Sequence, residues 1–229
     1  NVGIETFTRS VDESGGHALQ LSWQPPGNGD AELAWTLAGL AGDVDDAACA
    51  GSRIDRANAL AVERIIGAQP MLVDVALHAR DVWPDMERTL LHAGAPVAWM
   101  EMCGPMQGAM IGAVLYEGWA KDARGAQAML ARGEIRFAEC HDYGAVGPMA
   151  GVISASMPLF VVRNQVQQNV AYSNMNEGIG RVLRFGANGP EVVERLRWIE
   201  TVLAPTLRAA IRKIGGIDLK MIQAQALLM

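Results

Sequence analysis

The sequence CHDYGAVGPMAGVISASMP, residues 140–158, places a thiol, an imidazole and a carboxylate in a row before a glycine-rich run. Its glycines let the backbone adopt positive φ or approach a ligand closely, and its proline stiffens the run. Residues 135–138 lead into this stretch as a predicted strand, and residues 157–162 leave it as another. The stretch is therefore expected to be a loop between strands, where functional groups commonly lie.

The first 51 residues are expected to form a small N-terminal α/β unit. Residues 2–4 and 18–23 have strand-like patterns, and residues 7–13 between them suit a short helix, which indicates a βαβ-like unit. A helix is predicted over 31–40. The acidic, small-residue run that follows resembles a linker, so we place a domain boundary near Ser52.

Residues 52–229 are expected to form the main domain, which carries the glycine-rich loops. Apolar periodicity and the positions of Gly, Pro and Asp define its elements. The predicted strands cover 71–76 and 89–91, and the predicted helices run from Asp55 to Gly67, from Pro105, over 178–187, over 190–214 with a bend at Pro205, and from a cap at Asp218. The pattern as a whole indicates an α+β fold with short mixed strands and a helical C-terminal third.

Composition excludes several classes of partner. The net charge of −6 and the pI near 5.2 argue against nucleic acid and anionic membranes, which select clustered Lys and Arg. No apolar run approaches the ~20 residues that a membrane span needs. Three scattered cysteines without a CxxC motif favour a reduced, cytoplasmic protein.

Most familiar catalytic motifs are missing from the sequence. It contains no phosphate-binding GxxxxGK[ST], no GxGxxG between a strand and a helix, no GxSxG and no HExxH. Ser52-Arg53 is not followed by the Thr-Arg pattern of the aspartate and ornithine transcarbamylases. The four histidines form no close pair, so we expect neither a metal nor a cofactor.

A second glycine-rich feature precedes the first one in the chain. Gly104, Gly108 and Gly112 recur every four residues after a turn at His92 and Gly94, so they share one face of the predicted helix. A bare helix face serves either tight packing against another element or direct contact with a ligand. Tight packing is the commoner use.

Two histidines lie at glycine-rich turns and are candidates for proton transfer near neutral pH, His92 and His141. The alternative for His141 is a structural histidine that orients its turn. Cys140 is expected to be a small buried hydrophobe, because nothing in the sequence around it would lower its pKa. Asp142 suits a side-chain bond to the backbone of the turn.

A third candidate group lies between residues 176 and 184. Asn176 and Glu177 precede the predicted helix over 178–187, and Arg181 and Arg184 lie three residues apart on it. The two arginines would then clamp an anion from the same side. The alternative is that both belong to a solvated helix face.

Several long motifs in one order resemble the YlbE-like family. They include HAGAPVAWMEMCGPMQGAMIGAVLYEGWAKD, CHDYGAVGPMAGVISASMPLFVV, NEGIGRVLRFGA and GGIDLKMIQAQALLM, and the resemblance runs from about Ile54 to the end. The opening NVGIETF and SWQPPGNGD are also similar to the N-terminal part of the family. The chain stops at Met229 within a helical pattern, whereas family members continue with an acidic, His-containing segment and a further domain. We therefore expect the N-terminal part of a longer protein.

The resemblance implies a reaction. One branch of the family is similar to a subunit of the bacterial oxamate carbamoyltransferase of anaerobic allantoin breakdown, in purine catabolism. That enzyme works with an FdrA-like subunit and a third protein, so a hetero-oligomer is expected. The implied reaction interconverts oxalurate plus phosphate with oxamate plus carbamoyl phosphate.

Such chemistry needs anion binding and carbonyl polarisation more than a covalent nucleophile. Backbone amides around Gly104 and Gly147 and the side chains of Arg181 or Arg184 would hold phosphate or carboxylate oxygens. Asn176 would orient the carbamoyl group, and His141 or Glu177 would move the proton. The turn at His92 and Gly94 would complete the pocket.

The chain departs from the family pattern in its central loop. Family members usually read CHHxNAVGP, and this chain has Asp142 and Gly144 in place of the second histidine and the asparagine. One alternative is therefore a paralogue that acts on a different ureido or amide compound. Another is a non-catalytic assembly subunit whose glycine-faced helix and loops contact a partner.

Overall fold

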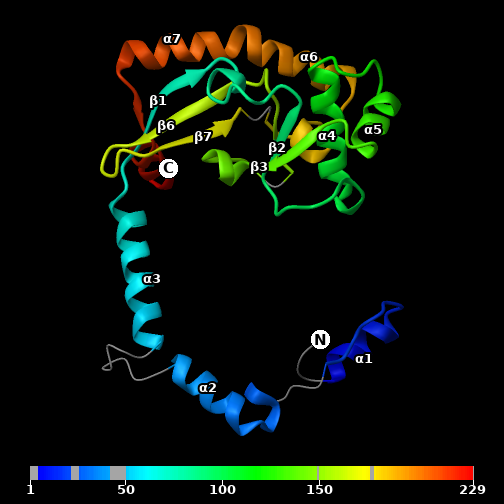
Figure 1. Ribbon diagram of the computed structural model, residues 1–229, viewed down its shortest axis with the longest axis vertical. Helices are drawn as coiled ribbons and strands as arrows, with labels where there is room; N and C mark the ends of the chain where they lie inside the picture. The colour runs from blue at the N-terminus through cyan, green and yellow to red at the C-terminus, as the bar shows by residue number, and fades with distance from the viewer. Residues whose placement is uncertain (1–4, 22–25, 42–49, 149, 176–177, 229) are drawn as a thin grey trace. The chain divides into compact units, whose positions relative to one another are not determined.

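The computed structural model describes residues 5–21, 26–41, 50–148, 150–175 and 178–228 (Figure 1). The chain divides into two compact units, Asn1–Gly67 and Ala68–Met229. The predicted boundary near Ser52 falls inside helix α3 (Ala50–Gly67), because residues 50–52 continue this helix instead of ending a linker.

The described residues of the first unit are mainly helical. Helices α1 (Glu5–Glu13) and α2 (Ala31–Ala41) confirm the predicted helices, and Asp30 caps α2 by accepting a hydrogen bond from the Leu33 amide at 3.0 Å. The predicted strand over 2–4 lies outside the described residues. Residues 18–20 are irregular and Leu21 is in a single β-bridge, so the βαβ-like pairing stays a prediction.

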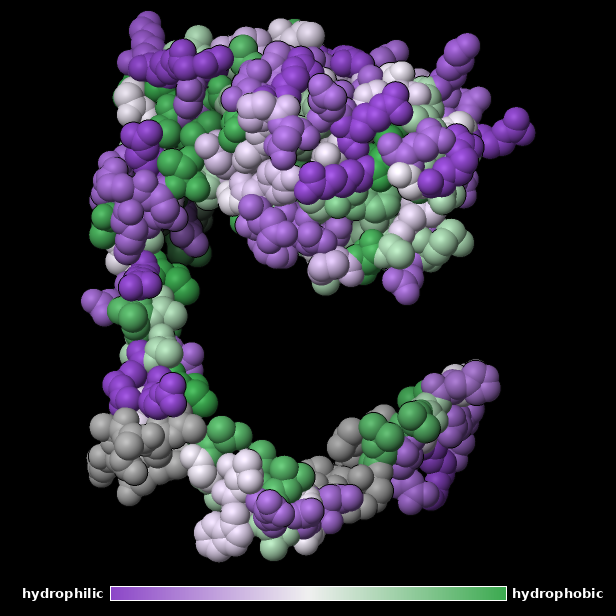
Figure 2. Space-filling model, viewed as in Figure 1, coloured by the Kyte–Doolittle hydropathy of each residue, from purple (hydrophilic) through white to green (hydrophobic). Residues whose placement is uncertain are grey.

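Large apolar side chains lie on the surface of the first unit. Ile65 and Ile66 of α3 are 72% and 69% exposed, and Trp35 of α2 is 79% exposed. Figure 2 shows hydrophobic residues along the visible face of α3. Exposed apolar groups gathered on one element are typical of a surface that contacts another protein.

Two mixed sheets form the frame of the second unit. The larger has the order β4 (Ala145–Val146), β7 (Val170–Asn174), β6 (Leu159–Asn164), β1 (Pro70–Ala76) and β8 (Ile217–Asp218); the smaller has the order β3 (Arg136–Glu139), β2 (Thr89–His92) and β5 (Val152–Ile153). Pairs β2–β3 and β4–β7 are parallel, and the other neighbours are antiparallel. The predicted α+β class with short mixed strands is confirmed.

Two helices connect the parallel strands β2 and β3. Helix α4 (Gly104–Tyr116) begins with Pro105 in its first turn, as predicted, and α5 (Ala123–Ala131) is capped by Asp122. A crossover of this kind is what parallel neighbours require. Because α4 follows β2, the start of the helix and the end of the strand lie on the same side of the smaller sheet.

The C-terminal third is helical, as predicted, but its long helix is interrupted. Helix α6 (Pro190–Trp198) is followed by a π-helical segment over Ile199–Leu203 and then by α7 (Ala204–Ile214), which lies beside β1 (Figure 1). Pro205 stands just after the change from the π-helical segment to α7, so the N–H that proline lacks falls where the hydrogen-bond pattern of the helix changes. Arg212 binds both carboxylate oxygens of Asp74 on β1, at 3.0 and 2.7 Å, and Asp218 caps the last helix, α8 (Leu219–Leu227).

A partly buried carboxylate holds the last part of the 140–158 stretch. Glu117, which follows α4, accepts hydrogen bonds from Ser154 Oγ at 2.6 Å, from the Ser156 amide at 2.7 Å and from Ser156 Oγ at 2.9 Å. Three donors to one carboxylate form strong, charge-assisted bonds. The end of α4 therefore fixes the chain that leaves the glycine-rich loop.

The bare face of α4 is used for packing inside the chain. A Cβ atom at Gly108 would lie 2.2 Å from the carbonyl oxygen of Gly186, and one at Gly112 would lie 2.3 Å from Leu183 Cδ1. Asn188 Nδ2 donates to the carbonyl oxygens of Gly108 and Gly186, each at 3.2 Å. The prediction of tight packing is confirmed for Gly108 and Gly112, and Gly104 has open space around it.

The predicted helix over 178–187 is wrong. Gly178, Gly180 and Gly186 have φ values of +104°, +99° and +85°, and Val182 is extended, so only a 3-10 turn forms at Leu183–Phe185. Positive φ is incompatible with a right-handed helix. The spacing of three therefore does not place Arg181 and Arg184 on one helix face.

In the described part of the chain, no helix combines the length and the apolar character needed to cross a membrane.

We expect Gly108→Ala to destabilise the second unit by ~1–3 kcal/mol or more, because its new methyl group would overlap a backbone oxygen that cannot rotate away. Gly104→Ala on the same helix is the matched control and should leave stability nearly unchanged. Urea unfolding of both variants measures the difference. Equal midpoints would contradict the close packing of α4.

Candidate functional site

The smaller sheet places two loops at the carboxyl ends of parallel strands. His92 ends β2 and lies opposite Glu139, which ends β3. Ligands of sheets with parallel strands bind outside these ends. The loop that starts at Ala93 and the turn over Cys140–Tyr143 are therefore in the position expected of a site.

His92 is a buried imidazole with a defined tautomer. Its side chain is 1% exposed, and its Nδ1 accepts a hydrogen bond from the Gly94 amide at 3.3 Å. The proton of the neutral ring therefore lies on Nε2, which is 4.0 Å from Glu139 Oε1. Burial lowers the pKa of His92 below its ordinary value, and His141 adds to this effect, while the Glu139 carboxylate opposes it.

A small cavity of about 160 Å³ lies between the two loops. It is lined by Ala93, Cys140, His141, Ala145, Val146 and Gly147. The structure thus brings together Ala93, which follows His92, with His141 and Gly147. His141 is 72% exposed, and its Nε2 lies 3.2 Å from Asp142 Oδ1.

Cys140 is the buried member of this cavity. Burial raises the pKa of its thiol to about 11, so the thiolate is scarce at neutral pH. The prediction that Cys140 is a small buried hydrophobe is confirmed.

A tight turn joins the site to the smaller sheet. The Gly151 amide donates to the Pro148 carbonyl at 2.6 Å, and a Cβ atom at Gly151 would lie 2.7 Å from that oxygen. Ala150 has a φ of +59°, which is unusual for a residue with a side chain. The Ala93 amide donates to the Gly151 carbonyl at 3.2 Å, which ties the turn to the end of β2.

A second cavity, of about 290 Å³, lies on the other side of this turn. It is lined by Cys103, Pro105, Pro148, Ala150, Arg184 and Phe185. Cys103 and Pro105, at the start of α4, line it, and the partial positive charge of a helix start favours an anion. Arg184 Nη2 donates to the Gly178 carbonyl at 3.1 Å, its guanidinium lies 4.6 Å from the centre of the Phe185 ring, and its Nε is buried without a partner among the described residues.

Arg181 is separated from Arg184. It is 83% exposed, pairs with Glu191 Oε1 at 3.4 Å and does not line the cavity. Of the two predicted arginines, only Arg184 is therefore placed at the site. Asn176 and Glu177 lie outside the described residues.

The sequence prediction missed Asn174 and Glu139. Asn174 is the last residue of β7, which runs parallel to β4. Because Val146 of β4 pairs with Ser173 of β7, Gly147 and Asn174 lie at the carboxyl ends of these two neighbouring strands. Asn174 is only 8% exposed, and its Oδ1 has no partner among the described residues. Neither residue stands in a motif, so only strand register reveals them.

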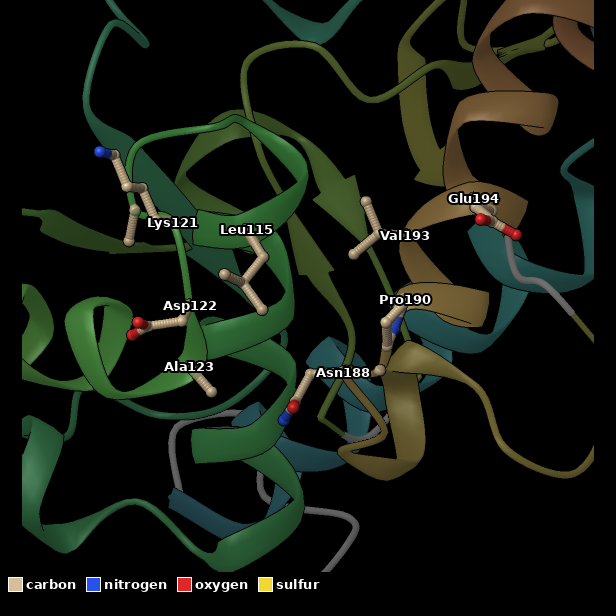
Figure 3. Close-up of a pocket in the computed structure, with 10 residues that line it drawn as sticks. Leu115, Lys121, Asp122, Ala123, Asn188, Pro190, Val193 and Glu194 are labelled. Carbon is tan, nitrogen blue, oxygen red and sulfur yellow. The ribbon is translucent and has the colours of Figure 1, made fainter.

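A larger cavity, of about 580 Å³, lies between the starts of α5 and α6 (Figure 3). Leu115, Lys121, Asp122, Asn188, Pro190, Val193 and Glu194 are among its lining residues. It contains none of the predicted site residues, and Asp122 is occupied as the cap of α5. In the residues that the structure describes, no group of three or more His, Cys, Asp or Glu side chains is arranged to hold a metal ion.

Comparisons with known proteins agree with the predicted resemblance. Residues 135–229 match the model of the family described as oxamate carbamoyltransferase subunit AllG. Over 178 residues the chain is 49% identical to AllG of Escherichia coli (strain K12), a match that covers 77% of the chain and 42% of AllG. Over 228 residues it is 44% identical to the Escherichia coli (strain K12) protein named uncharacterized protein YahG, covering 99% of the chain and 47% of YahG.

A solved structure shares the fold. It is the crystal structure of a conserved protein of unknown function from Enterococcus faecalis V583, with a TM-score of 0.70 and 44% identity, and the match covers 76% of the chain and 42% of that protein. The chain spans less than half the length of the curated relatives that it matches. Similarity to the carbamoyltransferase subunit is confirmed, while the YlbE-like name stays a prediction.

We expect iodoacetamide at neutral pH to modify Cys103 and to leave Cys140 unmodified in the folded protein, because Cys103 is exposed and Cys140 is buried with a raised pKa. Peptide mass spectrometry before and after unfolding measures both sites. Rapid modification of Cys140 in the folded protein would show that its thiol is accessible and reactive, and would contradict its assignment as a buried hydrophobic residue.

We expect Glu139→Gln to lower the pKa of His92 further, because the carboxylate favours the protonated ring. NMR titration of the His92 ring measures this. Since the pKa of folded His92 lies below its ordinary value of 6.5, the unfolded chain binds this proton first, so the free energy of unfolding should fall as pH drops below about 6.5. A pKa that rises in Glu139→Gln would contradict this geometry.

Proposed function

We propose that this chain is part of a carbamoyltransferase subunit that interconverts oxalurate plus phosphate with oxamate plus carbamoyl phosphate. The observation that carries the proposal is the match of residues 135–229 to the AllG family. This range contains His141, Gly147 and Arg184, which border the two cavities, and Asn174, whose Oδ1 lies beside Gly147. The similarity therefore includes the part of the chain that forms most of the site.

The proposed reaction exchanges one bond to the carbamoyl carbon. A phosphate oxygen forms a bond to that carbon, and the bond from the carbon to the oxamate nitrogen breaks. The departing nitrogen takes up one proton. The site must therefore hold two anions, polarise a carbonyl group and deliver a proton.

The cavity beside the start of α4 is the proposed anion site. Backbone amides near Gly104 and the guanidinium of Arg184 supply donors with positive charge. The buried Nε of Arg184 has no partner among the described residues, so a bound phosphate would satisfy it. The amide of Gly147 and, from the neighbouring segment, Asn176 would then orient the rest of the substrate.

The cavity between the two loops is the proposed place of proton transfer. His141 lines it and is accessible, while His92 is buried and already accepts a hydrogen bond from Gly94. We assign proton transfer to His141 or Glu177, and we assign to His92 the role of holding the turn at Gly94. The neutral His92 ring suits this role at neutral pH.

We also propose that the protein works in the cytoplasm with an FdrA-like subunit and a third subunit. AllG, to which the chain is similar, is a subunit by name. The exposed apolar residues of α2 and α3, among them Trp35, Ile65 and Ile66, supply a surface for such a partner. This surface also supports the second candidate, a non-catalytic assembly subunit, whereas the face of Gly108 and Gly112 does not, because it is covered within the chain.

The test is oxalurate phosphorolysis by the full-length protein with its partner subunits. Arg184→Ala should raise the KM for phosphate about tenfold or more, because a charged hydrogen bond is lost. His141→Ala should lower kcat. Arg181→Ala is the matched control and should change neither constant, since Arg181 is exposed and paired with Glu191.

If Arg184→Ala and His141→Ala both leave the kinetic constants unchanged while the complex still assembles, the proposed catalytic site in this chain is contradicted. That result would favour the non-catalytic assembly subunit. Turnover of a different ureido or amide compound in place of oxalurate would favour the paralogue. The substitutions at Asp142 and Gly144 make that comparison worth including.

A further inference from the structure

Asn174 presents a buried acceptor whose orientation is fixed. Its Nδ2 donates to the Val152 carbonyl at 3.4 Å. Because a carbonyl oxygen only accepts, the amide nitrogen must face Val152 and Oδ1 must face the other way. That oxygen has no hydrogen-bond partner in the described part of the chain, although the residue is 8% exposed.

Such an oxygen is costly to leave unpaired. A buried acceptor without a donor loses the hydrogen bonds that water would supply, at about 1–3 kcal/mol. Native proteins leave few buried polar groups in this state, and a functional role is one of the recognised reasons. The free acceptor therefore indicates a donor that binds during function.

The oxygen faces a gap that exists because residue 147 is glycine. A Cβ atom at Gly147 would lie 3.6 Å from Asn174 Oδ1, 3.5 Å from Ala93 Cβ and 3.8 Å from Gly151 Cα. All three are ordinary van der Waals distances, so a methyl group on residue 147 would fit there, and with glycine this methyl-sized space beside the oxygen is left open. Gly147 and Ala93 also line the cavity that contains His141, so the gap adjoins that cavity.

We propose that Asn174 Oδ1 and the gap beside Gly147 form a subsite for the N–H₂ group of a primary amide or ureido compound. The acceptor selects a group that donates, and a carboxylate oxygen in the same place would meet another oxygen. The other two atoms close to this space, Ala93 Cβ and Gly151 Cα, are carbons, so Asn174 Oδ1 is the acceptor among the three. The subsite deepens the proposed function, on which the choice of a carbamoyl ligand rests.

The position relative to the other groups fits this ligand. The subsite lies on the Gly147 side of the Pro148–Gly151 turn, and the cavity of Arg184 lies on the Pro148 and Ala150 side. Because the proposed function assigns phosphate to the cavity of Arg184, the amide compound is left to occupy the Gly147 side. Oxamate carries a primary amide, and oxalate is its analogue without the N–H₂ group.

The test is calorimetric titration of the full-length protein with oxamate and with oxalate. We expect the wild type to bind oxamate about tenfold or more tightly than oxalate, because only oxamate donates to Asn174. Asn174→Leu should lose this preference. Equal affinity of the wild type for both compounds, binding of neither, or a preference that Asn174→Leu retains would overturn the proposal.

A second variant covers the case in which Asn174→Leu fails to fold. Gly147→Ala fills the gap with a methyl group at distances that need no rearrangement, so its melting temperature should match that of the wild type while oxamate binding is lost. Gly39→Ala is the control, because Gly39 has open space around it and lines neither cavity, and it should keep both. Full oxamate affinity in folded Gly147→Ala would contradict the subsite.

The titration separates this inference from the proposed reaction. Oxamate preference that depends on Asn174, without phosphorolysis of oxalurate, would support the subsite and contradict the proposed function. Phosphorolysis of oxalurate, together with an oxamate preference that Asn174→Leu leaves unchanged, would support the proposed function and contradict the subsite.

Discussion

The contact between α4 and the segment around Gly186 is the constraint on which the site depends. Gly108 and Gly186 approach so closely that neither position has room for a side chain, since a Cβ atom at Gly186 would lie 2.8 Å from Pro105 Cα. Asn188 holds the contact by donating to the carbonyl oxygens of both glycines. The contact brings Arg184 and Phe185 to the start of α4, where they border one cavity together with Cys103 and Pro105.

Parallel strands then bring the remaining groups to the same region. The ends of β2 and β3 carry His92 and Glu139, and the ends of β4 and β7 lead to Gly147 and Asn174. The turn over Pro148–Gly151 joins the two sets, because the Ala93 amide binds the Gly151 carbonyl. The groups of the site thus come from four strand ends, one helix start and one turn. Burial raises the pKa of the Cys140 thiol, so Cys140 stays un-ionised beside them.

Much of this arrangement could be predicted from the sequence where local rules apply. Apolar periodicity and breaker residues located α1, α2, α4 and the strands β1, β2, β3 and β6, and the glycine turns indicated that His92, His141 and Gly147 belong together. The segment over 178–187 was predicted wrongly because its apolar and arginine spacing looks helical, while three glycines adopt positive φ instead. Asn174 could not be found in this way, because an unpaired buried oxygen is a property of packing and not of a motif.

The central claim is that the two cavities beside the Pro148–Gly151 turn bind the two reactants, phosphate in the cavity of Arg184 and the amide compound on the side of Gly147 and Asn174. A crystal structure of the full-length protein with oxamate and phosphate tests it most directly. The account predicts phosphate beside Arg184 and the first amides of α4, and the oxamate nitrogen beside Asn174 Oδ1. Both ligands in the cavity between α5 and α6, or neither ligand at the turn, would contradict it.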